Sequence, residues 1–428
     1  MTEPRTLADY ADQIGQCVRC GACQAPCPAY QETLREGSAA RGKIALAAAV
    51  LAGEAELDER MRQELSLCLL CGSCVAKCPN RVETDAIVAA LRRQITDEQG
   101  LSAIGKGVAA LTGSTPLLRG LLKGADLLAP LLFKSIPETS GLRLRFAPEG
   151  LKGRTLPPIP ERNLFARVPE FTAGDADKPV LGLFAGCALT CLYPETGETM
   201  ARLLHALGYS VFLPRAQGCC GMPALSSGNG PLLTQLAGRN LQAFAARETA
   251  AIITGCASCG GALTGHYPDL DDGLKPLAEA IVDIHVFLAG EGVIDRLASL
   301  PRHERRIRVT YHDPCHLRGR GITREPRQLL RALPQVEFVE MEDAALCCGL
   351  GGTFSAAHPE LSRAIGDRKL SGLRASGAEL IASACPGCVL QLQDIVTRAG
   401  LPVRAVHTMD LVAQALSGDL GDALRTKD

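Results

Sequence analysis

Eight cysteines near the N-terminus stand in two copies of one motif, C-x2-C-x2-C-x3-C-P. The first copy reads CVRCGACQAPCP from Cys17 to Pro28, and the second reads CLLCGSCVAKCP from Cys68 to Pro79. Three closely spaced thiolates can bind one [4Fe-4S] cluster, and a fourth thiolate next to proline reaches the neighbouring cluster where two motifs are present. The spacing therefore predicts two [4Fe-4S] clusters in this part of the chain.

The same rule divides the eight thiolates between the two clusters, because the fourth cysteine of each motif crosses to the other cluster. Gly21 and Gly72 follow the second cysteine of each motif, where a residue without a Cβ atom allows a tight turn. Tetrahedral zinc is the alternative, but it usually takes two C-x2-C pairs and would leave the other cysteines poorly placed. The predicted ligands are Cys17, Cys20, Cys23 and Cys78 for the first cluster and Cys27, Cys68, Cys71 and Cys74 for the second.

Ten further cysteines form a second repeat of longer period beyond residue 180. Each copy has a lone cysteine, then C-C-G, then C-x2-C. The adjacent thiolates stand beside a glycine that can take positive φ, and five sulfurs are one more than a cubane cluster needs. We therefore predict a distorted or non-cubane iron-sulfur centre in each copy, with a cubane cluster or zinc as alternatives. The predicted ligands are Cys187, Cys219, Cys220, Cys256 and Cys259 in the first copy and Cys315, Cys347, Cys348, Cys385 and Cys388 in the second.

The elements around these cysteines set the expected fold. Residues 38–68, between the two N-terminal motifs, are rich in Ala, Leu, Glu and Arg with apolar residues three and four apart, which predicts helix. Farther along, short β-branched runs precede the cysteines and helical patterns lie between them. Such alternation predicts α/β sheets, whose ligands gather at the carboxyl ends of strands. We expect an N-terminal α-helical two-cluster ferredoxin domain followed by two repeated α/β cysteine-rich domains.

The predicted boundaries follow these patterns. The leucine-rich part of the segment after residue 100 carries Arg119, Lys123 and Asp126, so it cannot cross a membrane. Packing against the chain's own domains is favoured for it over a membrane surface or a partner. The predicted domains are 1–100 with the two 4Fe-4S motifs, 101–175 as a helical and proline-rich linker, 176–302 as the first cysteine-rich domain and 303–428 as the second.

Composition excludes some classes of function. The chain has 428 residues, of which 46% are hydrophobic, so it can form several domains with real cores. Its 45 Lys and Arg residues balance 46 Asp and Glu residues without a basic block, so no nucleic acid partner is predicted. No signal peptide or membrane-spanning run is evident, which predicts a cytoplasmic location, with peripheral contact on the inner face of the cell membrane left open. In that reducing compartment the 19 cysteines predict metal ligation rather than disulfides.

One motif in the N-terminal segment is misleading. Gly37, Gly42 and Lys43 satisfy G-x4-G-K, the pattern of a phosphate-binding loop. Ile44 stands where that loop needs Ser or Thr, and no strand precedes the motif, so we reject it. We instead interpret Arg41 and Lys43 as an exposed basic helix start, in preference to a docking position near a cluster.

Three side chains in the long-period repeat have open roles. His312 and His316 flank Cys315 and could hydrogen-bond a cluster or relay a proton, but a histidine satisfied by a nearby carbonyl is the commoner case. Cys191 has no matching cysteine in the second copy, where Gly319 takes the equivalent place. A buried spare thiol is the prediction for Cys191.

Two ferredoxin motifs followed by two C-x31-C-C-G-x34/35-C-x2-C domains resemble the glycolate oxidase iron-sulfur subunit family. Related chains are the iron-sulfur subunits of D-lactate and anaerobic glycerol-3-phosphate dehydrogenases, and one of the heterodisulfide reductase subunits has the same cysteine-rich domain. The sequence YHDPCHL around Cys315 is more similar to the lactate and heterodisulfide relatives. The resemblance implies an iron-sulfur electron-transfer subunit of a flavin-dependent glycolate or D-lactate dehydrogenase, working with an FAD-containing partner subunit and a quinone or other acceptor.

The chain has no convincing dinucleotide fingerprint of its own. GLGGTF at 349–354 has the wrong glycine order, and GNGPLL at 228–233 places proline where a helix should begin. The chain alone is therefore not predicted to hold the flavin. A thiol-disulfide reductase like the heterodisulfide relatives is the alternative function, because both copies keep all five cysteines, whereas a zinc-bound scaffold would leave the ferredoxin motifs without a purpose.

Overall fold

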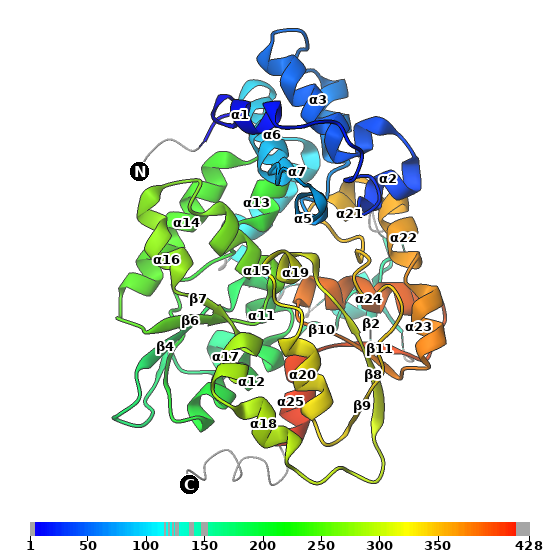
Figure 1. The fold of residues 1–428 in the computed structure, drawn as a ribbon. Coiled ribbons are helices and arrows are strands. Elements are labelled where there is room, and N and C mark those ends of the chain that lie inside the picture. The colour runs from blue at the N-terminus through cyan, green and yellow to red at the C-terminus, as the bar shows by residue number, and fades with distance from the viewer. Residues whose placement is uncertain are drawn as a thin grey trace.

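The computed structural model describes residues 5–114, 117–118, 120–121, 124, 128–136, 141–146 and 153–416. In Figure 1 the blue and cyan helices of the N-terminal part lie above two units of sheet and helix, one green and the other yellow to red. No helix among the described residues is long and apolar enough to cross a membrane. Arg119, Lys123 and Asp126, which support the prediction about the linker, lie outside the described residues.

The N-terminal part, residues 5–100, contains helices and no strand among its described residues. One face of α6 carries Ile87, Leu91 and Ile95, which are four residues apart and at most 1% exposed. This face packs on Leu65 and Ile44 from two other helices. The helices are α1 (Ala11–Gly15), α2 (Pro28–Thr33), α3 (Ala40–Leu51), α4 (Glu59–Ser66), α5 (Ser73–Lys77) and α6 (Thr84–Gln99).

The first cysteine-rich repeat contains a five-stranded sheet with the order β3-β5-β4-β6-β7. Its strands run parallel except for β3, which pairs antiparallel with β5 at the edge. Leu181, Val211 and Ile253 are buried in it, as expected for strands covered on both faces. The strands are β3 (Phe171–Thr172), β4 (Val180–Leu183), β5 (Ser210–Phe212), β6 (Ala251–Thr254) and β7 (Ile281–Asp283).

The second cysteine-rich repeat contains a four-stranded parallel sheet with the order β11-β10-β8-β9. These strands take the places of β7, β6, β4 and β5 in the first sheet, so the two repeats share one topology and the first adds the edge strand β3. The strands are β8 (Ile307–His312), β9 (Val336–Phe338), β10 (Leu380–Ser383) and β11 (Arg404–His407).

A common core joins the two repeats. Leu183 and Leu288 of the first repeat and Val309 and Met409 of the second belong to one cluster of buried residues. The two repeats therefore stabilise each other through buried apolar area. The helices around the sheets are α10 (Leu164–Arg167), α11 (Gly186–Cys191), α12 (Pro194–Ala206), α13 (Met222–Ser227), α14 (Gly230–Ala245), α15 (Ala257–Gly261), α16 (Lys275–Glu279), α17 (Ile284–Gly290), α18 (Val293–Ala298), α19 (Cys315–Gly319), α20 (Glu325–Ala332), α21 (Phe354–Ala357), α22 (Pro359–Asp367), α23 (Leu370–Ser376), α24 (Pro386–Arg398) and α25 (Thr408–Leu416).

The described residues of the predicted linker pack on the two repeats. Gly105 of α7 lies beside Ser227 of the first repeat, and the backbone N–H of Thr155 donates to Asp394 Oδ1 of the second over 2.8 Å. A helical N-terminal part followed by mixed helix and sheet is thus confirmed as the coarse architecture. The other elements of the linker are α7 (Ala103–Gly113), α9 (Ala129–Leu132), β1 (Phe133–Ile136) and β2 (Gly141–Leu144).

Candidate iron-sulfur sites

The first N-terminal motif encloses a small cavity. Its lining includes Cys17, Cys20 and Cys23 of the first motif together with Cys78 of the second. Gly21 makes the turn after Cys20 with φ at +82°, as the tight-turn prediction requires. The fourth cysteine of the second motif thus faces the first cavity, which is the crossed arrangement that the spacing predicts.

A second cavity is lined by Cys68, Cys71 and Cys74 of the second motif and by Cys27 of the first. Cys74 borders both cavities, so the two sites are neighbours. The backbone N–H of Tyr30 donates to Cys27 Sγ over 3.5 Å, and such a donor favours the thiolate form. Each predicted set of four cysteines thus lies around one cavity, and Cys74 of the second set also borders the first cavity.

The chemistry of these donors fits the predicted clusters. Burial raises the pKa of Cys27 to about 11 and that of Cys71 to about 12, so both thiols hold their protons more tightly than usual. A metal displaces such protons and binds the thiolates. Four sulfur donors around one cavity are the ligand set of a [4Fe-4S] cluster.

Lys43 lies beside the second cavity, and the prediction of an exposed position for it is wrong. It is 1% exposed, lines that cavity and donates from Nζ to the backbone carbonyls of Gly37 and Ser38. The ammonium group of Lys43 reaches these carbonyls only in the folded chain. The sequence shows two basic residues close together, but it does not show that one of them is buried. Arg41 keeps a more open position and pairs with Glu36.

In both repeats the cysteines follow the carboxyl ends of parallel strands, as predicted. The lone cysteine comes after β4 or β8, the C-C-G turn after β5 or β9, and the C-x2-C pair after β6 or β10. The glycines of the turns, Gly221 and Gly349, have φ values of +85° and +87°. A Cβ atom would lie 2.4 Å from Leu233 Cδ1 at Gly221 and 2.4 Å from Ser362 O at Gly349. Glycine is therefore required at both turns.

The ten cysteines of the two repeats form one continuous line, which we call the thiol row. Cys187 and Cys219 lie 3.7 Å apart at Sγ, and Cys348 and Cys388 lie 3.6 Å apart. Ser258 Oγ lies 3.3 Å from Cys385 Sγ where the row passes between repeats. The order of neighbouring thiols is Cys187, Cys219, Cys220, Cys259, Cys256, Cys385, Cys388, Cys348, Cys347 and Cys315.

The thiol row ends against the second N-terminal cavity. Cys71 of that cavity and Cys347 of the row pack around one small apolar cluster. Hydrogen bonds join the N-terminal part to the second repeat here: His316 Nε2 and Leu70 O lie 2.9 Å apart, and Arg318 Nη2 donates to Ser73 Oγ over 3.0 Å. The sequence predicts separate domains joined by a long linker, and it has no signal for this contact.

Two buried polar side chains that the sequence analysis missed hold the C-C-G turns. In the first repeat Asn240 is fully buried, accepts from the backbone N–H of Gly218 over 2.8 Å and donates to Cys219 O over 3.0 Å. In the second repeat Lys369 Nζ donates to the carbonyls of three residues at 2.8 to 3.2 Å. Burial lowers the pKa of Lys369 to about 8. The three acceptors are Asp343, Ala344 and Leu346.

The three side chains with open roles have different environments. His316 is satisfied by the carbonyl of Leu70, as the commoner case predicts. His312 is 1% exposed, and neither ring nitrogen has a hydrogen-bond partner among the described residues. Burial also holds the pKa of His312 well below its ordinary value, so its imidazole is neutral. Cys191 is 2% exposed, which agrees with a buried position.

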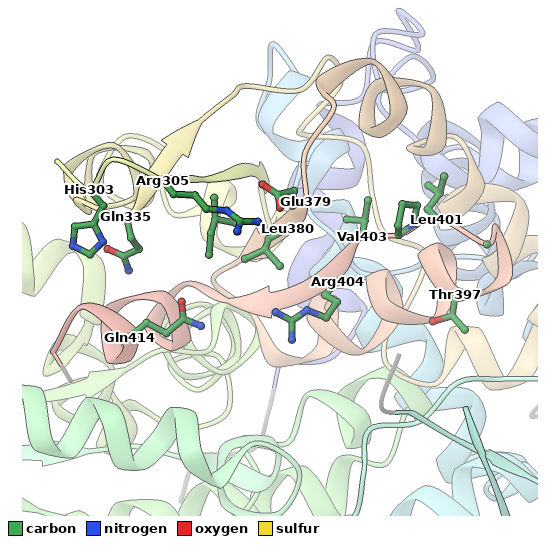
Figure 2. A pocket seen from close by; sticks show the side chains of 13 residues that line it. His303, Arg305, Gln335, Glu379, Leu380, Thr397, Leu401, Val403, Arg404 and Gln414 are labelled. Carbon is green, nitrogen blue, oxygen red and sulfur yellow. The ribbon is translucent and has the colours of Figure 1, made fainter. Parts of the chain in front are cut away.

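One pocket lies away from the cysteines. It measures about 920 Å³ and is lined by residues such as Ile307, Leu380 and Arg404, which begin β8, β10 and β11. Figure 2 shows Arg305, Arg404 and Gln414 around it. Because cysteines follow the opposite ends of β8 and β10, this pocket is not part of the candidate sites.

Comparison with known proteins identifies the family. A model described as a 4Fe-4S dicluster domain matches residues 13–82, and one described as a cysteine-rich domain matches residues 181–264 and 309–393. The probable glycolate oxidase iron-sulfur subunit of Bacillus subtilis is 34% identical over 423 residues, covering 94% of each chain. This chain belongs to the glycolate oxidase iron-sulfur subunit family.

Other relatives carry related names. Lactate utilization protein A of Geobacillus kaustophilus is 31% identical over 241 residues, which cover 54% of this chain and 98% of the relative. A dihydromethanophenazine:CoB--CoM heterodisulfide reductase subunit of Methanosarcina acetivorans is 27% identical over 429 residues, which cover 94% of each chain. As a member of the glycolate oxidase family, this chain is an iron-sulfur protein of the oxidoreductase class, and its dicluster and cysteine-rich domains hold several iron-sulfur clusters.

Proposed function

We propose that the chain is the electron-transfer subunit of a flavin-dependent 2-hydroxy-acid dehydrogenase for glycolate or D-lactate. An FAD-containing partner subunit abstracts the hydride, and the electrons pass through this chain to a quinone or another acceptor. The observation that carries the proposal is the unbroken succession of cysteine sites, from the first N-terminal cavity through the second and along the thiol row.

The proposed ligands are those that the spacing predicts. The two N-terminal cavities and the thiol row support this assignment, because each predicted set of cysteines is close together. When bound, the clusters supply one-electron transfer, which the side chains of this protein cannot perform themselves. The ligand sets are Cys17, Cys20, Cys23 and Cys78; Cys27, Cys68, Cys71 and Cys74; Cys187, Cys219, Cys220, Cys256 and Cys259; and Cys315, Cys347, Cys348, Cys385 and Cys388.

The chain's own residues hold these sites in order and bury the middle of the thiol row. Cys220, Cys256 and Cys385 are at most 4% exposed, whereas Cys20 at the first N-terminal cavity is exposed. Beside Cys20 stands Val18, whose side chain is 68% exposed. We place the electron-transfer contact with a partner at this open face, because electron transfer between subunits needs a site near the surface.

The proposal keeps the predicted boundaries, with domains at 1–100, 101–175, 176–302 and 303–428. We also propose that the protein is bound peripherally to the cytoplasmic face of the cell membrane. A quinone acceptor lies in the membrane, and the free cysteines need a reducing compartment. High-salt washing of membranes should then release the complex, and a requirement for detergent would contradict a peripheral attachment.

A thiol-disulfide reductase is the second candidate. It is supported by the retention of all five cysteines in both repeats and by the similarity to a heterodisulfide reductase subunit. In that function the substrate disulfide would be cleaved at one of the cysteine-rich sites rather than at a partner's flavin.

One experiment separates the two functions. The protein is purified anaerobically from its own cells, co-purifying proteins are identified, and the iron-sulfur EPR signals are recorded after addition of glycolate, D-lactate or a disulfide. We expect an FAD-containing dehydrogenase subunit in the complex and reduction of the clusters by glycolate or D-lactate. Absence of a flavoprotein, together with reoxidation of dithionite-reduced clusters by the disulfide, would support the reductase instead.

A further inference from the structure

His312, the last residue of β8, has a buried imidazole ring. Its exposure is 1%, and both ring nitrogens lack a hydrogen-bond partner among the described residues. Buried polar atoms are nearly always paired, so an imidazole with two unpaired nitrogens is able to bind a ligand. His316, four residues later, differs because Leu70 O and Ser258 Oγ lie 2.9 and 3.4 Å from its ring nitrogens.

Two cysteines of the thiol row face His312. One ring nitrogen and the sulfurs of Cys348 and Cys388 all lie within 4.8 Å of one another, and the two sulfurs are 3.6 Å apart. Donors that share one tetrahedral metal ion stand about 3.5–3.8 Å apart, given metal–sulfur bonds of about 2.3 Å and metal–nitrogen bonds of about 2.0 Å. The two sulfurs have this spacing, and the ring nitrogen lies within 4.8 Å of both, close enough for the three atoms to bind one ion.

The first repeat offers a natural comparison. Phe184 stands three residues before Cys187, as His312 stands three residues before Cys315. Phe184 is 0% exposed and stacks on Phe244 with ring centroids 6.0 Å apart. Because an apolar ring fills this position in the first repeat, the five-cysteine arrangement does not itself require a nitrogen donor. The histidine is a property of the second repeat alone.

We propose that His312 is a metal ligand of the second repeat and that one of its ring nitrogens binds the same metal ion as Cys348 and Cys388. The ion is one iron of the centre proposed for this repeat, so the inference rests on that part of the proposed function. A neutral imidazole nitrogen is a suitable ligand for iron. Metal binding would give one of the two unpaired ring nitrogens a partner. The centres of the two repeats then differ in donor set, with sulfur donors in the first and sulfur plus nitrogen in the second.

The test uses the full-length chain, produced in cells supplied with 15N-labelled histidine and ⁵⁷Fe and purified anaerobically with its clusters. Pulsed EPR, Mössbauer spectra, and iron and zinc contents are compared between the wild type and two variants. His312→Phe copies the residue of the first repeat, and His312→Gln keeps a polar side chain in case the phenylalanine disturbs folding. His303→Phe, at an exposed histidine, is the matched control.

We expect a strong 15N coupling from a directly bound imidazole in the wild type and in His303→Phe, and its loss in both His312 variants. One iron site in the Mössbauer spectrum should change with it, while the signals of the N-terminal clusters remain. A wild type without this coupling, whose Mössbauer spectrum and metal contents are the same in both His312 variants, overturns the inference. If the wild type contains zinc and the His312 variants lose it, His312 is still a metal ligand, but the iron centre of the proposed function is refuted.

Discussion

The two cysteine-rich repeats have the same strand order and the same five cysteines, but their surroundings differ in charge. The first repeat places Phe184 and the neutral amide of Asn240 beside its cysteines. The second places His312 and the ammonium of Lys369 there. A duplicated fold has thus kept the turns that hold the thiols while the groups around them changed.

The two repeats also differ in their position in the molecule. The second repeat lies between the N-terminal cavity at Cys71 and the cysteines of the first repeat, so sulfurs that would be negatively charged as cluster ligands lie on both of its sides. A buried cation beside such a group reduces the unfavourable free energy of burying the negative charges. The first repeat is at the far end of the thiol row and has fewer neighbouring thiolates.

The largest expected effect comes from removing one ligand in each repeat. Cys347→Ser and Cys219→Ser should each lose about four irons per chain and abolish electron delivery to the acceptor. Only Cys347→Ser should also alter the EPR signal of the second N-terminal cluster, because Cys347 lies near Cys71. Iron analysis, EPR and acceptor reduction check this. Identical N-terminal signals in the two variants would mean that the order of sites is wrong.

Removing the buried ammonium of the second repeat should have the next largest effect. Lys369→Met leaves three backbone carbonyls without their donor and should lower the free energy of unfolding by about 3 kcal/mol. Lys77→Met, at an exposed lysine, should change it by less than about 0.5 kcal/mol. Anaerobic denaturant titrations measure both values. Equal stability of the two variants would show that the Lys369 hydrogen bonds do not hold the turn.

The two C-C-G glycines should respond unequally to alanine. At Gly349 the added methyl group meets the backbone oxygen of Ser362, which cannot easily move, and the free energy of unfolding should fall by about 3 kcal/mol. At Gly221 the methyl group meets the flexible end of Leu233, so the loss should be about 1–2 kcal/mol. Denaturant midpoints compare the two variants, and a larger loss for Gly221→Ala would contradict the packing described here.

The smallest effect concerns the cysteine that only the first repeat has. Cys191→Ala removes a buried sulfur and should lower the free energy of unfolding by about 1 kcal/mol without changing iron content. Gly319→Cys, the reciprocal change in the second repeat, should add no iron. Iron and sulfide analysis of both variants is the measurement, and iron loss from Cys191→Ala would make Cys191 a cluster ligand.

The short-range features of this protein were predictable because their residues lie near one another in the sequence. The C-x2-C-x2-C-x3-C spacing places Cys17, Cys20 and Cys23 around one cavity, since a tight turn at Gly21 needs no distant contact. Strand-end cysteines followed from the alternation of strands and helices, because ligands at parallel strands gather at their carboxyl ends. The long period of the cysteines likewise indicates two related repeats, since the same spacing recurs in both halves.

The sequence by itself therefore determined the cysteine sets, the turns and the repeated topology. Only the tertiary structure decided that Lys43 is buried, that Cys71 lies near Cys347, and that one thiol row crosses between the repeats. The physical reason is that these features depend on contacts between residues far apart in the chain. A side chain becomes buried and desolvated only when distant parts of the chain pack around it, and the local spacing of residues does not determine that packing.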